Sequence, residues 1–255
     1  GLPLSQLDMF LAMKEGILRP AGGEIDEIIA NQKAAAQKIE NYFTGVVEER
    51  KSNPAGQDDI LSLFLTAEID GQRLTVDEIV GPCFLFILAG LDTVTDSLEC
   101  FMAYLAAHPA QRQRIVDDPS IIPSTVEELL RWESPVTTVA RTATSDIDLE
   151  GCPIKKGEGL GVIIGAANVD ERALPDAFTV DLMRNPNKHF AFGGGIHRCL
   201  GSHLARMELR VALREWHRRI PAYSIAPGAD LVYQPALRQI ESLPLVFAPE
   251  SGGQG

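Results

Sequence analysis

One loop carries most of the structural information in this chain: Phe192-Gly193-Gly194-Gly195-Ile196-His197-Arg198-Cys199-Leu200-Gly201. Its consecutive glycines let the backbone approach a flat ligand closely and adopt positive φ values. A helix is predicted to begin at about Leu200 and to continue to about Arg219, so its positive N-terminal end points back at Cys199. A cysteine in that field ionises more readily than a free one, so the loop predicts a thiolate ligand.

Two other interpretations of this loop stay open from the residues alone. The cysteine could be an ordinary core residue beside a glycine-rich turn, since free cysteines are usually buried as small apolar groups. A zinc site is the other option, with the ligands His189, His197, Cys199 and His203. Against zinc, ligands that straddle a helix start rarely converge on one tetrahedral ion, and no CxxC pair accompanies them.

The same loop resembles the FGxGxHxCxG signature of the cytochrome P450 family and matches it at every fixed position. The resemblance implies a haem b cofactor whose iron is bound by Cys199. It also implies that the haem is held by Phe192, Gly193, His197, Gly201 and, on a predicted strand, Arg141. Of these, His197 and Arg141 are expected to hold the haem propionates, because a guanidinium suits a carboxylate. Taken alone, Arg141 would be a strand-edge surface charge.

A long helix is predicted from Thr75 to Ala107. Thr75 and Glu78 have the spacing of a capping box, and His108-Pro109 ends the pattern. The helix is apolar nearly all round from Cys83 to Leu91, so we expect it to run through the middle of the domain.

The centre of this helix, Ala89-Gly90-Leu91-Asp92-Thr93, holds residues that are unfavourable in a helix interior. The stretch resembles the acid–alcohol motif of the P450 central helix. That likeness implies that Asp92 and Thr93 are catalytic residues that deliver protons during dioxygen activation, and that Ala89 and Gly90 lie against the haem. From the residues alone, a helix with one polar edge toward solvent is an equal interpretation, because further acidic residues follow.

Glu128 and Arg131 lie three residues apart on a helix predicted over residues 124–132. Alone, such a pair is usually a surface salt bridge of little worth. It also matches the Glu-x-x-Arg motif of the P450 family, which implies that the pair bonds a later arginine, and Arg184 is the candidate. We assign these three residues to structure and not to chemistry.

The remaining pattern is mainly helical. Helices are expected over residues 7–19, 24–50, 59–67 and 109–116, and strands within 136–167 and near 231–233 and 243–247. The predicted fold class is therefore mainly α with a small β part, in agreement with the C-terminal portion of the cytochrome P450 fold. We expect one haem-binding domain over residues 1–250, lacking the N-terminal helices of the family, and a flexible tail over residues 251–255.

Composition narrows the classes of partner. The formal net charge of −12 favours solubility and disfavours binding to nucleic acid. The four cysteines without a CxxC pair fit a reducing compartment. The longest strongly apolar run, Cys83 to Leu91, is too short to span a bilayer. We therefore expect a cytoplasmic protein that binds neither nucleic acid nor membrane.

As a whole, the resemblance implies a haem-thiolate monooxygenase that inserts one atom of dioxygen into a small apolar substrate, with electrons from ferredoxin and ferredoxin reductase. The arginine stripe from Arg206 to Arg218 could guide an acidic redox partner or simply face solvent. Stretches such as residues 199–206 are most similar to bacterial camphor-hydroxylase-type members. The alternative is a truncated, catalytically inactive haem-binding fragment. The substrate side is expected to be lined by Leu85, Leu88, Thr137 and Leu237.

Overall fold

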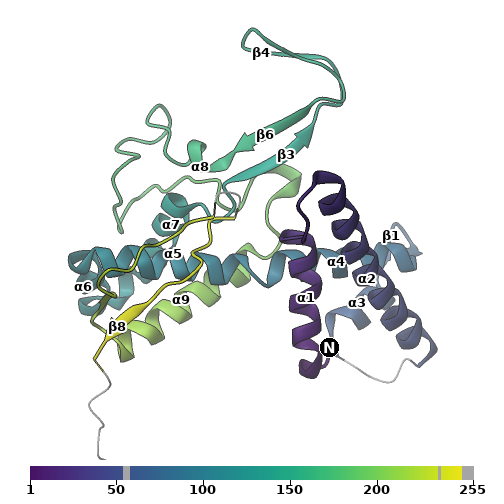
Figure 1. Cartoon of the computed structure of the whole chain (residues 1–255), viewed down its shortest axis with the longest axis horizontal. Coiled ribbons are helices and arrows are strands. Elements are labelled where there is room, and N and C mark those ends of the chain that lie inside the picture. Colours follow the sequence, from purple (N-terminus) through teal and green to yellow (C-terminus); the bar gives the residue numbers. More distant parts are fainter. Residues whose placement is uncertain (54–57, 235–236, 249–255) are drawn as a thin grey trace, which may run out of the picture. The chain divides into compact units, whose positions relative to one another are not determined.

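The computed structural model describes residues 1–53, 58–234 and 237–248. The chain divides into two compact units, Gly1–Asp92 and Thr93–Gly255 (Figure 1). Helices dominate both units, and the described strands form small two-stranded sheets. The predicted class, mainly α with a small β part, is therefore confirmed. The expected tail, residues 251–255, lies outside the described residues.

The first unit is a cluster of helices. Its elements are η1 Leu4–Gln6, α1 Leu7–Leu18, α2 Ile25–Ser52, α3 Ile60–Thr66, β1 Glu68–Ile69, β2 Gln72–Arg73 and α4 Val76–Gly90. Its core forms where α1, α2 and α4 meet, because each helix turns one apolar face inward, and Ile39, Val47 and Ile79 are fully buried there. The predicted capping box is present: the Glu78 amide donates to Thr75 Oγ1 at 3.3 Å, and the Thr75 amide donates to the Glu78 carboxylate at 2.8 Å.

The second unit combines helices with the remaining strands. Its elements are α5 Thr93–Ala107, α6 Pro109–Asp117, η2 Pro119–Ile121, α7 Ile122–Glu133, β3 Thr138–Thr142, β4 Ile147–Leu149, β5 Cys152–Ile154, β6 Gly159–Ile163, α8 Ile164–Ala167, η3 Gly195–His197, α9 Ser202–Arg219, β7 Tyr223–Ile225 and β8 Leu245–Phe247. The core lies between α5, α7 and α9, where Phe101, Leu129 and Leu213 are fully buried. β3 pairs antiparallel with β6, and the β4–β5 hairpin extends beyond that pair (Figure 1).

Two predicted elements differ from the structure. The helix expected from Thr75 to Ala107 is interrupted, because α4 ends at Gly90 and α5 begins at Thr93. The break falls at Gly90 and Asp92, two residues with low helix propensity. The C-terminal strand pair also differs: β8 pairs with β7, and Tyr233 makes only one isolated bridge, to Ile240.

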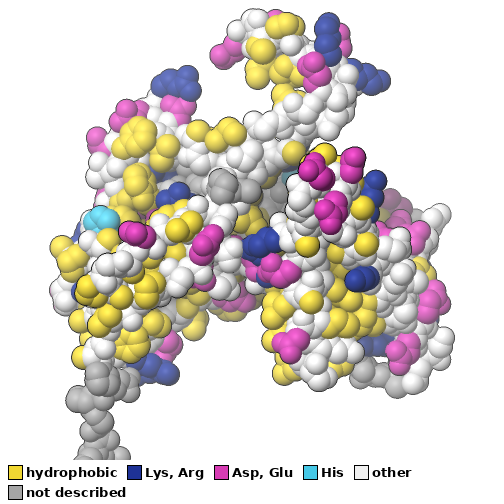
Figure 2. All heavy atoms as spheres, viewed as in Figure 1, with side chains coloured by type: hydrophobic (Ala, Val, Ile, Leu, Met, Phe, Trp, Pro, Cys, Tyr) yellow, Lys and Arg dark blue, Asp and Glu magenta, His cyan; other side chains and the backbone are white. Residues whose placement is uncertain are grey.

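Apolar surface remains uncovered on both units. By length and composition alone the stretch Val76–Ala107 could cross a membrane, a test that the core helices of soluble proteins also pass. Here its two halves contribute to two separate cores, with Ile79 in one and Phe101 in the other. Large apolar side chains nevertheless reach the surface of each unit (Figure 2), and those around Cys199 matter for the site described next.

Candidate functional site

The glycine loop before α9 presents Cys199 to solvent. Gly193 and Gly195 have φ values of 66° and 68°, which other residues rarely adopt, so glycine is strongly favoured at both positions. Two backbone hydrogen bonds close the loop: the Gly193 amide donates to Phe190 O at 2.7 Å, and the Cys199 amide donates to Phe192 O at 2.8 Å. The cysteine backbone is therefore fixed, while its side chain is free and exposed.

The N-terminal end of α9 lies next to this thiol. α9 begins at Ser202, slightly later than predicted, and the Ser202 amide donates to Cys199 O at 3.4 Å. A Cβ added to Gly201 would lie 3.9 Å from Cys199 Sγ, so the sulfur lies against the residue that precedes the helix. The amides at a helix N-terminus favour negative charge, so this geometry can stabilise a thiolate.

The surroundings of Cys199 fit a flat, apolar cofactor with acidic side groups. Ile196 is 96% exposed and Leu200 is 77% exposed, although such side chains are usually buried. Uncovered apolar groups beside an uncovered thiol indicate a surface that a ligand completes. His197 and Arg141 are exposed as well and carry the donors that a carboxylate needs. The residues present in this unit therefore fit a haem.

The zinc alternative has no support in the described part of the chain, where no group of three or more His, Cys, Asp or Glu side chains could hold a metal ion. His189, the fourth ligand of that alternative, instead contacts the Glu127 carboxylate through Nε2 at 3.1 Å. The simple core-cysteine interpretation does not hold either, because the Cys199 side chain is exposed.

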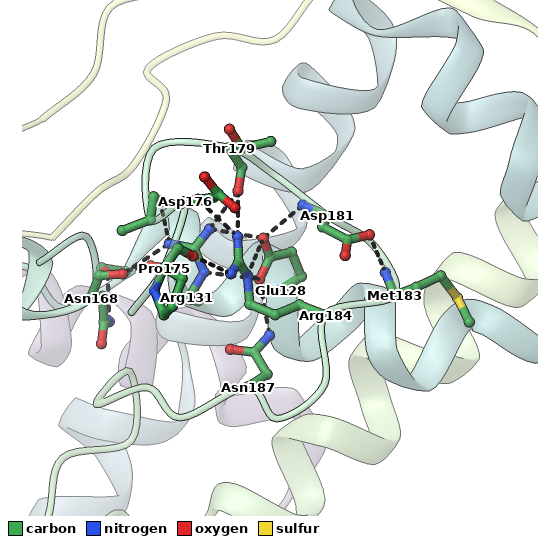
Figure 3. Close-up of polar contacts among 12 residues, drawn as sticks. Glu128, Arg131, Asn168, Pro175, Asp176, Thr179, Asp181, Met183, Arg184 and Asn187 are labelled. Carbon is green, nitrogen blue, oxygen red and sulfur yellow. Dashed lines mark hydrogen bonds and ion pairs between the residues drawn. The ribbon is translucent and has the colours of Figure 1, made fainter. Parts of the chain in front are cut away.

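Glu128 and Arg131 form the centre of a buried network in the second unit (Figure 3). Both side chains are 0% exposed, and Arg131 donates to the Glu128 carboxylate from Nε at 2.9 Å and from Nη2 at 2.8 Å. Arg184, the arginine expected to join them, donates from Nε to the two Glu128 oxygens at 3.1 and 3.2 Å. The pair is therefore not a surface salt bridge.

The same two arginines hold the backbone of the segment that leads to the cysteine loop (Figure 3). Arg131 Nη1 donates to Asn168 O at 2.9 Å and to Ala177 O at 2.8 Å. Arg184 donates from Nη1 to Pro175 O at 2.9 Å and from Nη2 to Thr179 O at 2.8 Å. The network thus fixes residues 168–184 to α7, which is a structural role.

In the first unit, two basic side chains bind Asp92. Lys14 Nζ donates to Asp92 Oδ1, and Arg19 Nη1 lies 3.3 Å from Asp92 Oδ2. The side chains of Lys14 and Asp92 are 6% and 8% exposed. Asp92, the acidic residue of the predicted acid–alcohol motif, is therefore a buried carboxylate. It is bound by Lys14 from α1 and by Arg19 at the C-cap of α1. No sequence signal identifies these partners, because the contact joins positions far apart in the chain.

The other expected site residues are exposed or half-buried within their units. On α4, Leu85, Ala89 and Gly90 are exposed and Leu88 is half-buried. Apart from the neighbouring residues and backbone of its own helix, no described atom lies within 4 Å of a Cβ built on Gly90, so open space adjoins the backbone there. In the second unit, an isolated antiparallel bridge between Val136 and Leu237 brings the segments of Thr137 and Leu237 together.

The family model for cytochrome P450 matches residues 6–119 and 120–216. The chain belongs to the cytochrome P450 family. This P450 chain is 34% identical over 262 positions to the steroid C26-monooxygenase of Mycolicibacterium smegmatis, covering 98% of the chain and 63% of that relative. It is 37% identical over 209 positions to the methyl-branched lipid omega-hydroxylase of Mycobacterium tuberculosis, covering 81% of the chain and 48% of that relative.

Solved structures confirm the P450 fold. CYP109E1 from Bacillus megaterium in complex with corticosterone superposes with a TM-score of 0.83 and 31% sequence identity, covering 96% of this chain and 66% of that structure. The P450 chain spans about 63% of the length of the steroid C26-monooxygenase, so it corresponds to part of a longer P450.

One carboxylate of the P450 chain, Glu127, joins α7 to both sides of the cysteine loop, a role that no sequence pattern indicates. Besides its contact with His189, Glu127 accepts hydrogen bonds from Arg206 Nε at 2.7 Å and Arg206 Nη2 at 2.9 Å. The Arg206 guanidinium carbon also lies 4.3 Å from the centroid of the Phe192 ring. The predicted arginine stripe is therefore partly used for contacts inside the unit.

This carboxylate predicts a pH-dependent stability. Burial opposes ionisation of Glu127, but the hydrogen bonds from His189 and Arg206 outweigh it and lower the pKa from 4.5 to about 2. Because the folded pKa is depressed, the stabilisation is complete above the unfolded pKa and is lost as the pH falls toward 2. We expect Glu127→Gln to lower the free energy of unfolding by about 2 kcal/mol at pH 7 and by less than half as much near pH 3, measured by urea titration.

The matched control is Glu215→Gln, which removes an exposed ion pair with Arg218 in the same unit. This control should change the free energy of unfolding little at either pH. An equal cost of Glu127→Gln at both pH values would contradict the ionic role of Glu127.

Proposed function

We propose that this chain carries the haem-thiolate centre of a P450 monooxygenase, with Cys199 as the ligand to the iron of haem b. The observation that carries the proposal is the exposed Cys199 thiol at the N-terminal end of α9, in a loop that matches the family signature and lies beside uncovered Ile196 and Leu200. When bound, the haem supplies the redox-active iron at which dioxygen is activated. The alternative of an inactive fragment is not favoured, since the relatives are named as monooxygenases and hydroxylases.

The remaining residues of the proposed site bind and orient the cofactor. Phe192, Gly193 and Gly201 would shape the loop that contacts the haem. His197 and Arg141 hold its propionates through charge-assisted hydrogen bonds. Ala89 and Gly90 are proposed to contact the haem as well, because the open space next to the Gly90 backbone allows a ligand to approach closely.

Asp92 and Thr93 are proposed to move protons from solvent to the reacting oxygen. The Asp92 carboxylate is held by Lys14 and Arg19, and these contacts would position it for this role. We expect Asp92→Asn to slow product formation roughly a hundredfold, because the amide cannot accept and release a proton. The rate of product formation in light and heavy water is the measurement, and the asparagine variant should show the larger solvent isotope effect.

The control for that variant is Glu15→Gln. Glu15 is the other carboxylate that contacts Lys14, at 2.9 Å, so this substitution perturbs the same lysine and leaves Asp92 in place. We expect a rate close to that of the unmodified chain. Equal slowing in both variants would show that Asp92 acts through packing and not through proton delivery.

The substrate is proposed to be an apolar organic molecule of the steroid or lipid class, hydroxylated with one atom of dioxygen while the other leaves as water. Support comes from the steroid and lipid named for the relatives. The substrate side of the site would be lined by Leu85, Leu88, Thr137 and Leu237. We further propose that ferredoxin and ferredoxin reductase supply the electrons. The proposed location is cytoplasmic, without membrane contact. Within the family, we propose that the chain belongs to the camphor-hydroxylase-type subgroup.

The test of this proposal is a carbon monoxide difference spectrum of the reduced chain after loading with haem. A strongly red-shifted Soret band, typical of thiolate-ligated haem, is the expected result. A band typical of histidine-ligated haem would contradict ligation by Cys199. Failure to retain haem would contradict the proposal that these residues hold the cofactor.

A further inference from the structure

Arg238 connects segments of the second unit that are far apart in sequence. Its Nε donates to Glu133 Oε2 at 2.6 Å, and its amide donates to Pro135 O at 2.8 Å. Its carbonyl oxygen accepts from Cys100 Sγ at 3.1 Å, and its guanidinium carbon lies 4.7 Å from the centroid of the Tyr233 ring. One residue thus holds together the end of α7, the segment that leads into β3, α5 and the segment at Tyr233.

Burial makes these contacts dependent on one another. The Glu133 side chain is 4% exposed, and burial raises its pKa while the Arg238 guanidinium acts in the opposite direction. A buried carboxylate is stable in its charged form only when it is paired, so Glu133 needs this cation. Burial also raises the pKa of Cys100 to about 12, so the thiol stays protonated and can donate to the Arg238 carbonyl.

The residue before Arg238 gives this connection a functional consequence. Leu237 pairs with Val136 in an antiparallel bridge, and Thr137 follows Val136 directly. On the other side of Arg238, Ile240 is 2% exposed and packs in a small core with Cys100. The segment is therefore anchored on both sides of Arg238, and the position of this arginine sets the position of Leu237.

We propose that Arg238, held by Glu133, is a positioning residue that fixes Leu237 against Val136 and thereby sets the shape of the substrate-side wall. The inference rests on the proposed function, which places Thr137 and Leu237 on that wall. Arg238 acts through the backbone of its neighbour, so a change at Arg238 alters which ligands fit and leaves the cysteine loop and its thiolate unchanged.

The first test needs no cofactor. Hydrogen exchange is measured by mass spectrometry on the full chain and on Arg238→Gln, Arg238→Lys and Glu133→Gln. We expect the amides of residues 237–241 to exchange about tenfold or more faster in Arg238→Gln and Glu133→Gln, with partial recovery in Arg238→Lys, which keeps the charge. The control is Asp59→Asn, which removes another largely buried carboxylate from its ion pair, with Arg50 in the first unit, and should leave these amides unchanged. Unchanged exchange in Arg238→Gln would overturn the proposal.

The second test reads the shape of the wall in the haem-loaded chain. Imidazole and the bulkier phenylimidazole are titrated spectroscopically, and the ratio of their dissociation constants is compared between the unmodified chain and Arg238→Gln. We expect this ratio to change about tenfold in Arg238→Gln while the carbon monoxide band stays in place, since a general loss of stability would not discriminate between ligands by size. An unchanged ratio with an intact thiolate band would overturn the positioning role alone. Absence of a thiolate band in the unmodified chain would instead contradict the proposed function, and the exchange experiment would then decide the role of Arg238.

Discussion

Replacing Cys199 by serine is expected to abolish the strongly red-shifted Soret band of the reduced, carbon monoxide-treated chain. A serine hydroxyl remains protonated near neutral pH, so it cannot supply the negatively charged sulfur that donates electron density to the iron. The helix end beside Gly201 would then face a neutral group. We expect complete loss of the thiolate-type band, whether or not some haem is still retained.

The chain offers a matched control for this substitution. Cys152 lies in the same unit and is also free and exposed, but it lies in β5, outside the glycine loop. Cys152→Ser is expected to keep the full band at unchanged haem occupancy. If Cys199→Ser kept the band and Cys152→Ser lost it, Cys152 would be the iron ligand and the assignment of Cys199 would be wrong. Retention of the band in both single variants would contradict cysteine ligation by either residue.

The features that sequence reasoning predicted well depend on local chemistry. The glycines at 193 and 195 have the positive φ values that only glycine adopts without strain, and the pattern of the loop depends on those angles. The capping box at Thr75 and Glu78 likewise follows from side chains that satisfy nearby backbone amides. Both are decided within a few residues, so the sequence contains all that is needed to predict them.

Contacts between distant segments could not be predicted in the same way. Lys14 and Arg19 read as ordinary charges on a helix, and only the folded unit shows them bound to Asp92. Arg238 and Glu133 are also far apart in sequence, and their buried contact depends on the path of the whole second unit. Arg184 is an exception, because the family resemblance named a later arginine as the partner of Glu128.

The boundaries of two helices differ from those predicted. The apolar pattern favoured one helix through Leu91, but the low helix propensity of Gly90 and Asp92 coincides with a break where Asp92 is bound by Lys14. The start of the helix predicted over residues 124–132 also differs: α7 begins at Ile122, and Ser124 Oγ donates to Ile121 O at 2.9 Å. A proline in the first turn allows the earlier start, because its missing N–H would have no helical partner there.

Replacing Glu128 by glutamine is expected to have the largest effect on stability of any single change considered for this chain. Glu128 is fully buried and accepts hydrogen bonds from Arg131, Arg184, Asn187 and the Asp181 amide. Glutamine has nearly the same shape, but it removes the negative charge and turns an NH₂ group toward donors. Two guanidinium groups would then lack their counterion, and breaking a buried pair in this way costs about 3–5 kcal/mol.

That cost can be measured selectively in the second unit and compared with an exposed pair. Both tryptophans, Trp132 and Trp216, lie in the second unit, so tryptophan fluorescence during urea unfolding reports on this unit alone. Glu215→Gln, which removes an exposed ion pair with Arg218, should cost less than about 1 kcal/mol by the same measurement. Since a domain of ordinary stability unfolds with about 5–15 kcal/mol, a cost of about 3–5 kcal/mol should remove a large part of the stability of the second unit and weaken its retention of haem. Similar costs in free energy of unfolding for the two variants would contradict the bracing role of Glu128. A Glu128→Gln chain that is stable and binds haem but turns over slowly would instead indicate that this carboxylate has a catalytic role.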